Sequence, residues 1–159
     1  MTGTAKIDAE ARRAARLAAV QALYQMELAG AGAEEVTEEF EAHRFGDTPT
    51  DADFFKSIVE GVPRHQAEID KAIANCLSQT WTLARVDSIL RAILRAGGLE
   101  LVARRDVPAK VVIDEYVGIA HDFFAGDEPG FVNAALDRIA HRKRAPEFGE
   151  PVPDDELGF

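Results

Sequence analysis

Apolar residues recur every three or four positions along most of the chain, a spacing typical of amphipathic helices. No segment shows the alternation of apolar and polar residues that a half-buried strand requires. The clearest stripe belongs to a helix predicted to begin near residue 86: Val86, Ile89, Leu90, Ile93, Leu94, Gly97 and Leu101. The pattern predicts an all-α protein, a single-domain bundle of about seven helices.

Glycines and prolines divide the predicted helices from one another. The first helix is predicted over residues 9–29, with Asp8 as a candidate cap and Gly30 as its stop. Pro63 is expected to end a third helix and open a fourth, because proline disrupts a helix interior. The other predicted boundaries follow the same signals: a short acidic helix at 34–43, a loop at 45–50, and helices that begin near Pro108 and Pro129.

Two features of the clearest helix predict how it begins and packs. Asp87 lies at its N-terminal end, where the helix dipole favours a carboxylate. Gly97 and Gly98 each cost about 1 kcal/mol relative to alanine in a helix interior. Two adjacent glycines therefore indicate close approach by another helix or a local bend.

Composition excludes several classes of protein. The chain has 159 residues, which suits one domain, and a formal net charge of −10. Its single cysteine, Cys76, allows neither an internal disulfide nor a CxxC motif. No run approaches the roughly 20 apolar residues of a membrane span, and no apolar segment follows the first residues as in a signal peptide. We expect a cytoplasmic protein with no membrane association.

Charge is distributed unevenly along the chain. Acids gather in residues 34–53 and in the last fifteen residues, which hold five acids and no base. We predict a flexible N-terminus at 1–8, a helical domain at 9–144 and an acidic, disordered tail at 145–159. Because charges are screened beyond about 8 Å at physiological salt, a local basic patch can still bind an anion.

Three arginines form such a patch within one turn of the first helix. Arg12, Arg13 and Arg16 are three or four positions apart, and guanidinium groups match the oxygens of phosphate. Farther along the same helix, Gln21 and Tyr24 offer hydrogen bonds and a ring for base stacking. The spacing is equally compatible with a solvated surface turn, and Tyr24 with a place in the core.

The sequence offers no motif for catalysis or cofactor binding. It lacks GxxxxGK[ST], GxGxxG and GxSxG, so neither a nucleotide loop nor a nucleophile elbow is predicted. The histidines show no metal-ligand spacing: His43, His65, His121 and His141. We therefore expect no cofactor, no metal site and no enzymatic activity.

Five segments, in order between residues 9 and 140, resemble the NusB family of transcription antitermination factors. They are RRAAR with VQALYQ at 12–25, FF, GV and ID within 54–70, Trp81 with AILR and LEL up to 101, VPAKVVIDE at 107–115, and FVN with LD at 131–137. Each fragment alone is weak evidence for the family, but five fragments in the same order and spacing are specific for it.

The resemblance implies a fold of about seven helices and binding of boxA RNA, the antitermination signal of ribosomal RNA transcripts. It also implies a heterodimer with NusE, a ribosomal protein of the small subunit, which joins other Nus factors and RNA polymerase. NusE would be expected to contribute positive charge. These implications fit an acidic chain that carries a local cluster of arginines.

The same resemblance assigns the candidate RNA-binding residues. It places the family's arginine motif on this chain with Ala14 where the family often has a further arginine. It also adds residues around the start of the last helix to those on the first, although Phe131, like Tyr24, has the alternative of a core position. The full candidate set is Arg12, Arg13, Arg16, Gln21, Tyr24, Asp127, Phe131 and Asn133.

Two alternatives remain open. The chain is alternatively a non-enzymatic scaffold of the transcription or ribosome-assembly machinery, with RNA contact incidental. A NusB-like domain also occurs ahead of an RNA cytosine methyltransferase, but that catalytic part needs a glycine-rich cofactor loop and a nucleophilic cysteine, whereas Cys76 lies in a helical apolar stripe. The acidic tail is outside the family pattern, and one hypothesis is that it masks basic residues.

Overall fold

The computed structural model describes residues 2–77, 83 and 86–156. Within these residues the protein has six α-helices, short π-helical and 3-10 turns, and no strand. The predicted all-α fold is confirmed. The chain divides into two compact units, residues 1–64 and 65–159, each with its own helices and buried side chains.

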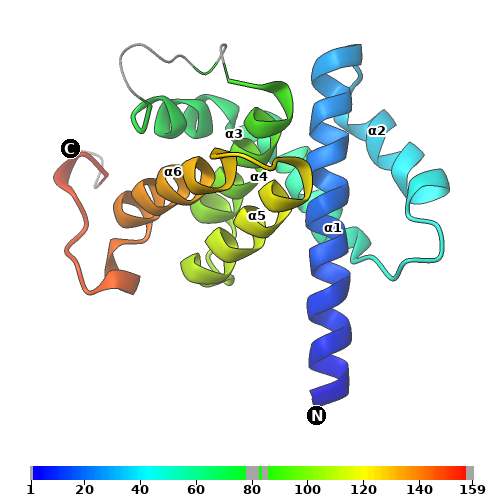
Figure 1. The fold of residues 1–159 in the computed structure, drawn as a ribbon, viewed down its shortest axis with the longest axis horizontal. Coiled ribbons are helices and arrows are strands. Elements are labelled where there is room, and N and C mark those ends of the chain that lie inside the picture. The colour runs from blue at the N-terminus through cyan, green and yellow to red at the C-terminus, as the bar shows by residue number, and fades with distance from the viewer. Residues whose placement is uncertain (1, 78–82, 84–85, 157–159) are drawn as a thin grey trace. The chain divides into compact units, whose positions relative to one another are not determined.

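The first unit is built on the long helix α1, Thr2–Ala29, with α2, Ala33–Glu39, beside it (Figure 1). A π-helical turn, Phe40–Arg44, continues α2, and the first part of α3, Ala52–Ala74, completes the unit. Its buried side chains recur at the three- and four-residue spacing of the sequence pattern: Ala15, Ala19, Val20, Ala22, Val36, Phe40, Phe54, Phe55, Ile58 and Val59.

Three phenylalanines hold the segment between α2 and α3. The Phe40 ring stacks on Phe55 with centroids 5.5 Å apart, and the Phe45 ring meets Phe55 edge-on at 5.0 Å. The segment then returns to α1, where the backbone N–H of Asp51 donates to the Ala11 carbonyl at 3.1 Å. The loop predicted between these helices is confirmed.

Helix α1 begins earlier than the sequence analysis predicts. It starts at Thr2 rather than near Ala9, so Asp8 lies inside the helix and does not cap it. Residues 4–8 contain no proline or glycine, and nothing in them stops the helix from extending toward the N-terminus. The flexibility expected for residues 1–8 stays a prediction.

The prediction that Pro63 separates two helices is wrong, because α3 runs without a break from Ala52 to Ala74. Pro63 lacks the N–H that would bond to the Val59 carbonyl, at a cost of about 3 kcal/mol. Each buried aliphatic side chain contributes about 1.5–3 kcal/mol, so several of them together outweigh that cost. The buried stripe continues across the proline: Phe55, Ile58, Val59, Val62, Ile69 and Ile73. This merger explains six α-helices instead of about seven.

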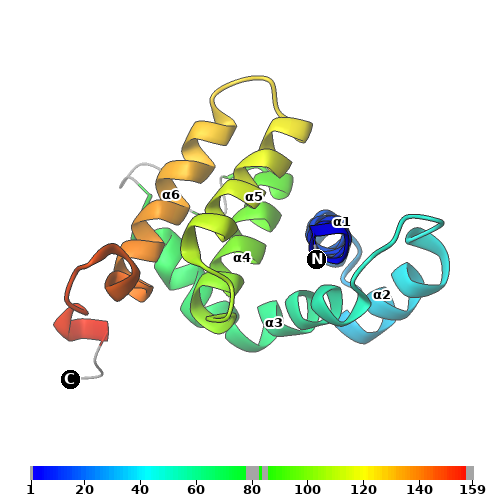
Figure 2. The same ribbon diagram turned by 90° about the horizontal axis from the view of Figure 1, so that it is seen from below.

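The second unit packs three helices side by side, as Figure 2 shows: α4, Ser88–Ala103, α5, Ala109–Phe123, and α6, Glu128–Lys143. The end of α3 also belongs to this unit. Side chains from all four helices are buried: Ile69, Ile73, Ile93, Leu94, Leu99, Leu101, Val112, Tyr116, Leu136 and Ile139. They form the apolar stripes that the sequence predicts.

The starts of these helices follow the predicted signals. Asp87 is the N-cap of α4, and its Oδ1 accepts the backbone N–H groups of Ile89 at 2.9 Å and Leu90 at 3.3 Å. Pro108 immediately precedes α5, and Pro129 is the second residue of α6. The cap and the prolines thus fix where each helix begins.

The glycine pair in α4 marks a close helix approach, as one reading of the sequence predicts. A Cβ placed on Gly97 would lie 2.9 Å from Leu136 Cδ1, on α6. A Cβ on Gly98 would lie 3.0 Å from Ile69 Cγ2, on α3. Leu136 and Ile69 are fully buried, so the absence of a side chain at both glycines lets the two neighbouring helices reach α4.

Arg144, directly after α6, ties the end of α4 into this unit. Its guanidinium is 2% exposed and donates to four backbone carbonyls at 2.7–3.0 Å: those of Glu100, Leu101, Arg104 and Val107. The last carbonyls of a helix have no partner within the helix. Arg144 therefore satisfies the C-terminal end of α4.

Glu147 lies in the 3-10 turn Ala145–Phe148 and ties the start of α5. Its Oε1 accepts the backbone N–H of Ala109 at 2.9 Å, and its Oε2 accepts from Arg144 at 2.6 Å. Burial alone would raise the pKa of Glu147, but these two donors outweigh it and hold the pKa below its ordinary value. Composition alone predicts disorder for the tail, because it does not include partners such as Ala109 and Leu101, which lie about forty residues away in the chain.

Candidate nucleic-acid interface

The three arginines of the N-terminal motif lie on one turn of α1, above an aromatic ring. The guanidinium carbons of Arg12 and Arg16 lie 4.7 Å and 4.9 Å from the centroid of the Phe54 ring. Arg12 Nε is also 3.7 Å from Asp51 Oδ2. Cation–π contact and one ion pair therefore hold two of the three arginines against the start of α3.

The three arginines differ in their access to solvent. Arg16 is only 3% exposed, so its guanidinium packs against Phe54 and does not face solvent. The Arg12 side chain is 38% exposed, and Arg13 is exposed. Arg13 is therefore the most exposed arginine of the motif, Arg12 pairs with Asp51, and Arg16 packs on Phe54.

Two further candidates lie farther along α1. Gln21 is exposed and Tyr24 is half-buried. Tyr24 follows Arg13 by eleven residues, three helical turns, so the two lie on the same face about 16 Å apart along the axis. A guanidinium for a phosphate and a ring for a base thus occur on one face of one helix.

The other three candidates lie at the start of α6, in the unit of residues 65–159. Asp127 is exposed and precedes the helix, and its carbonyl accepts the backbone N–H of Phe131 at 3.1 Å. Phe131 is half-buried, one turn from Asp127. Asn133 is exposed, but it is two residues from Phe131 and points to a different side of the helix. These residues form a second candidate group, on α6.

The partners of the arginines are not predicted from the sequence. Asp51 and Phe54 lie about forty residues from Arg12 and Arg16, and no local pattern connects them. Their types carry a weak signal, because an acid and an aromatic at the start of a helix are common. The burial of Arg16 depends on this packing and is invisible in helical spacing.

Other kinds of site find no support in the described part of the chain. Among residues 2–77, 83 and 86–156, no group of three or more histidines, cysteines or acids is placed to hold a metal ion. Cys76 is half-buried, and burial raises the pKa of its thiol. None of the described helices is long and apolar enough to cross a membrane.

Comparison with known sequences gives a consistent family. The model of the NusB family matches residues 13–141. The transcription antitermination protein NusB of Maricaulis maris is 54% identical over 147 residues, which cover 88% of this chain and 92% of that protein. The protein of the same name from Allorhizobium ampelinum is 55% identical over 145 residues, 87% of this chain and 91% of that protein.

Solved structures agree with this assignment. T. maritima NusB superposes with a TM-score of 0.70 at 29% identity, covering 93% of this chain and 97% of that chain. A chain of the crystal structure of antitermination factors NusB and NusE in complex with dsRNA gives a TM-score of 0.70 at 26% identity, covering 80% of this chain and 94% of that chain. The relatives are named as antitermination proteins, which agrees with the prediction that the chain is not an enzyme. The chain belongs to the NusB family.

Proposed function

We propose that this protein is an RNA-binding antitermination factor that binds boxA RNA together with NusE and supports transcription of ribosomal RNA operons in the cytoplasm. Its membership of the NusB family, and a similar structure containing NusB, NusE and RNA, support the proposal. Other Nus factors and RNA polymerase are the expected further partners. The observation on which the RNA-binding surface depends is the exposed Arg13 on the same face of α1 as Tyr24.

The residues of α1 divide the work of RNA binding. Arg13 contacts a phosphate, which gives affinity without sequence preference. Tyr24 stacks on an unpaired base, and Gln21 offers hydrogen bonds to a base edge. Arg16 acts indirectly: its packing on Phe54 holds the turn that presents Arg13. At the start of α6, Phe131 and its neighbours offer a second stacking ring and polar groups.

The proposal is tested by replacing the exposed arginine alone. Arg13→Ala should weaken boxA binding and lower the slope of log K against log salt by about 0.7, the value for one phosphate contact on single-stranded RNA. Arg44→Ala is the matched control, because Arg44 is an exposed arginine of the same unit that lies 3.8 Å from a carboxylate oxygen of Glu39. The measurement is a titration of labelled boxA RNA and of a scrambled RNA, with and without NusE.

The outcomes separate the competing functions. RNA binding by Arg13→Ala that equals the parent in affinity and salt slope would show that Arg13 does not contact a phosphate, and would contradict the proposed surface. Binding that requires NusE and does not distinguish boxA from the scrambled RNA would favour the protein scaffold. A preference of the parent for boxA, reduced affinity in Arg13→Ala and no change in Arg44→Ala would support the proposal.

A further inference from the structure

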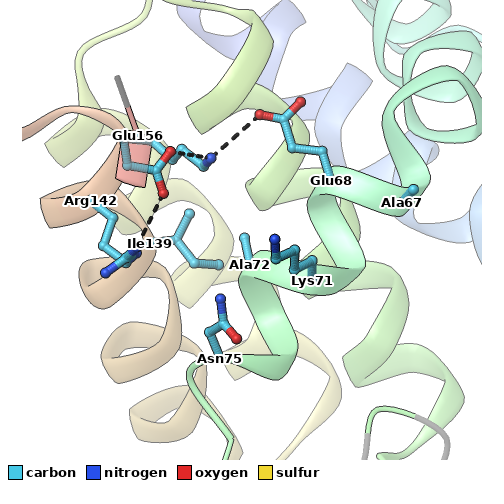
Figure 3. A pocket seen from close by; sticks show the side chains of 9 residues that line it. Ala67, Glu68, Lys71, Ala72, Asn75, Ile139, Arg142 and Glu156 are labelled. Carbon is cyan, nitrogen blue, oxygen red and sulfur yellow. Dashed lines mark hydrogen bonds and ion pairs between the residues drawn. The ribbon is translucent and has the colours of Figure 1, made fainter. Parts of the chain in front are cut away.

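A polar groove lies between the C-terminal part of α3 and the end of α6, entirely within the unit of residues 65–159 (Figure 3). Its volume is about 400 Å³. Three cations line it, Lys71 from α3 and Arg142 and Lys143 from α6. The carboxylate of Glu68 also lines it, with Oε1 3.5 Å from Lys143 Nζ. Its apolar side chains are Ala67, Ala72 and Ile139.

The groove already holds an anionic group from the chain itself. The 3-10 turn Asp154–Glu156 places the Glu156 carboxylate against α6, where Oε2 is 2.5 Å from Lys143 Nζ and Oε1 is 3.3 Å from Arg142 Nη2. The side chains of Glu156 and Lys143 are only 17% and 15% exposed. This carboxylate therefore bridges an ammonium and a guanidinium with its two oxygens in a partly desolvated position.

The lining indicates which anion the groove suits. In this arrangement each oxygen of the carboxylate contacts its own cation. Proteins hold the two unesterified oxygens of a backbone phosphate in the same way. A peptide partner usually needs a large apolar pocket for an anchoring side chain, and two alanines and one isoleucine do not provide it. Asn75 adds an amide at the base of the groove, where it can donate to a further oxygen.

We propose that the groove between α3 and α6 is an RNA phosphate-binding site, and that Glu156 occupies it as an intramolecular competitor. Arg142, Lys143 and Glu156 all lie beyond residue 141, where the match to the family model ends. The inference rests on the proposed RNA-binding function and adds to it a second contact, which the tail opposes. Removing the Glu156 carboxylate leaves Glu68, which lies 3.5 Å from Lys143, as the acid among the lining residues.

The test compares two substitutions that change the net charge equally. Glu156→Gln removes the carboxylate from the groove, whereas Asp154→Asn removes an exposed carboxylate of the same turn. At about 50 mM salt, where phosphate contacts are strong, Glu156→Gln should bind RNA about three- to tenfold more tightly than the parent. Its salt slope should steepen by about 0.7 to 1.4, for one or two added phosphates, and Asp154→Asn should stay close to the parent. Adding Arg142→Ala to Glu156→Gln should remove the gain.

The probes are boxA RNA and a scrambled RNA of equal length, measured by fluorescence anisotropy with the full chain. Because phosphates carry no sequence, the gain in Glu156→Gln should be the same on both RNAs. Equal affinities for Glu156→Gln and Asp154→Asn overturn the inference, even if the parent prefers boxA and depends on Arg13. A gain seen with a polyglutamate peptide but not with RNA also overturns it, since the groove would then bind acidic protein segments. Loss of the boxA preference alone would contradict the proposed function and leave the groove supported.

Discussion

Gly97 and Gly118 offer a comparison in which one substitution has opposite effects at two helical positions. Gly97 lies in α4, where a new Cβ would be 2.9 Å and 3.0 Å from the two Cδ atoms of Leu136 and 3.3 Å from Tyr116 Cδ2. Gly118 lies inside α5 and is exposed, with nothing within 4 Å of a new Cβ. Replacing each glycine by alanine therefore adds the same methyl group to a filled site and to an open one.

The two stability changes share the gain in helix propensity and differ in the space around the new methyl group. In both helices alanine gains about 1 kcal/mol over glycine in backbone entropy. At Gly97 the Leu136 side chain is fully buried, and overpacking of this kind costs about 1–3 kcal/mol. Gly118→Ala should thus be more stable than the parent by up to about 1 kcal/mol. Because the helix-propensity gain cancels between the variants, Gly97→Ala should be less stable than Gly118→Ala by about 1–3 kcal/mol.

The assay is equilibrium unfolding in urea, followed by the circular dichroism of the helices. The slopes of the free energy against urea should be equal for the parent and both variants, so that the midpoints report stability alone. Equal stabilities for Gly97→Ala and Gly118→Ala would refute the reasoning, because they would mean that α4 and α6 are not in the close contact described. A Gly97→Ala variant more stable than the parent would refute it more strongly.

Three further predictions concern the ends of the helices. Arg144→Ala should lower the free energy of unfolding in urea by about 3–5 kcal/mol, because the carbonyl partners and Glu147 lose a buried charged donor. Arg138 is exposed on α6, and Arg138→Ala should change the free energy of unfolding by less than about 0.5 kcal/mol. Glu147→Gln should be less stable than the parent near neutral pH, because the lowered folded-state pKa of Glu147 means that its ionised form stabilises the fold. This deficit should begin to shrink as pH falls below the ordinary carboxyl pKa of 4.5 and should be lost as pH falls through the lowered folded-state pKa, which unfolding curves of both proteins from roughly pH 7 to pH 3 would show. Asp87→Ala should lose about 1 kcal/mol and Asp87→Asn much less, since asparagine also caps helices, and equal losses would contradict the capping role.

The sequence predicts the fold well where one local signal agrees with the apolar pattern. Asp87 lies at the start of α4 as the sequence predicts, where it caps the helix, and the glycines after it meet side chains of α3 and α6. Pro63 shows the opposite case, in which a local rule predicts a break and the buried stripe on both sides of the proline overrides it. Backbone preference alone could not decide this, because the favourable term comes from packing against residues distant in sequence.

The candidate site is predicted less completely than the fold. Helical spacing places Arg12, Arg13 and Arg16 on one turn, but it does not say which guanidinium faces solvent. That depends on Phe54 and Asp51, whose positions follow from the return of the chain to α1. The groove at the end of α6 is harder still, because Glu156 reaches it from a tail whose composition predicts disorder.

The contacts of Arg144 and Glu147 also bear on how the protein matures during translation. Helices α4 and α5 are synthesised before these two residues. Until the later segment emerges from the ribosome, the carbonyls at the end of α4 and the N–H at the start of α5 have only water as a partner. A nascent chain halted before residue 144 would hold all the apolar side chains of α4–α6 and still lack these polar closures. Such a chain should be open to proteases between α4 and α5, and the segment that carries Arg144 and Glu147 would complete its protection.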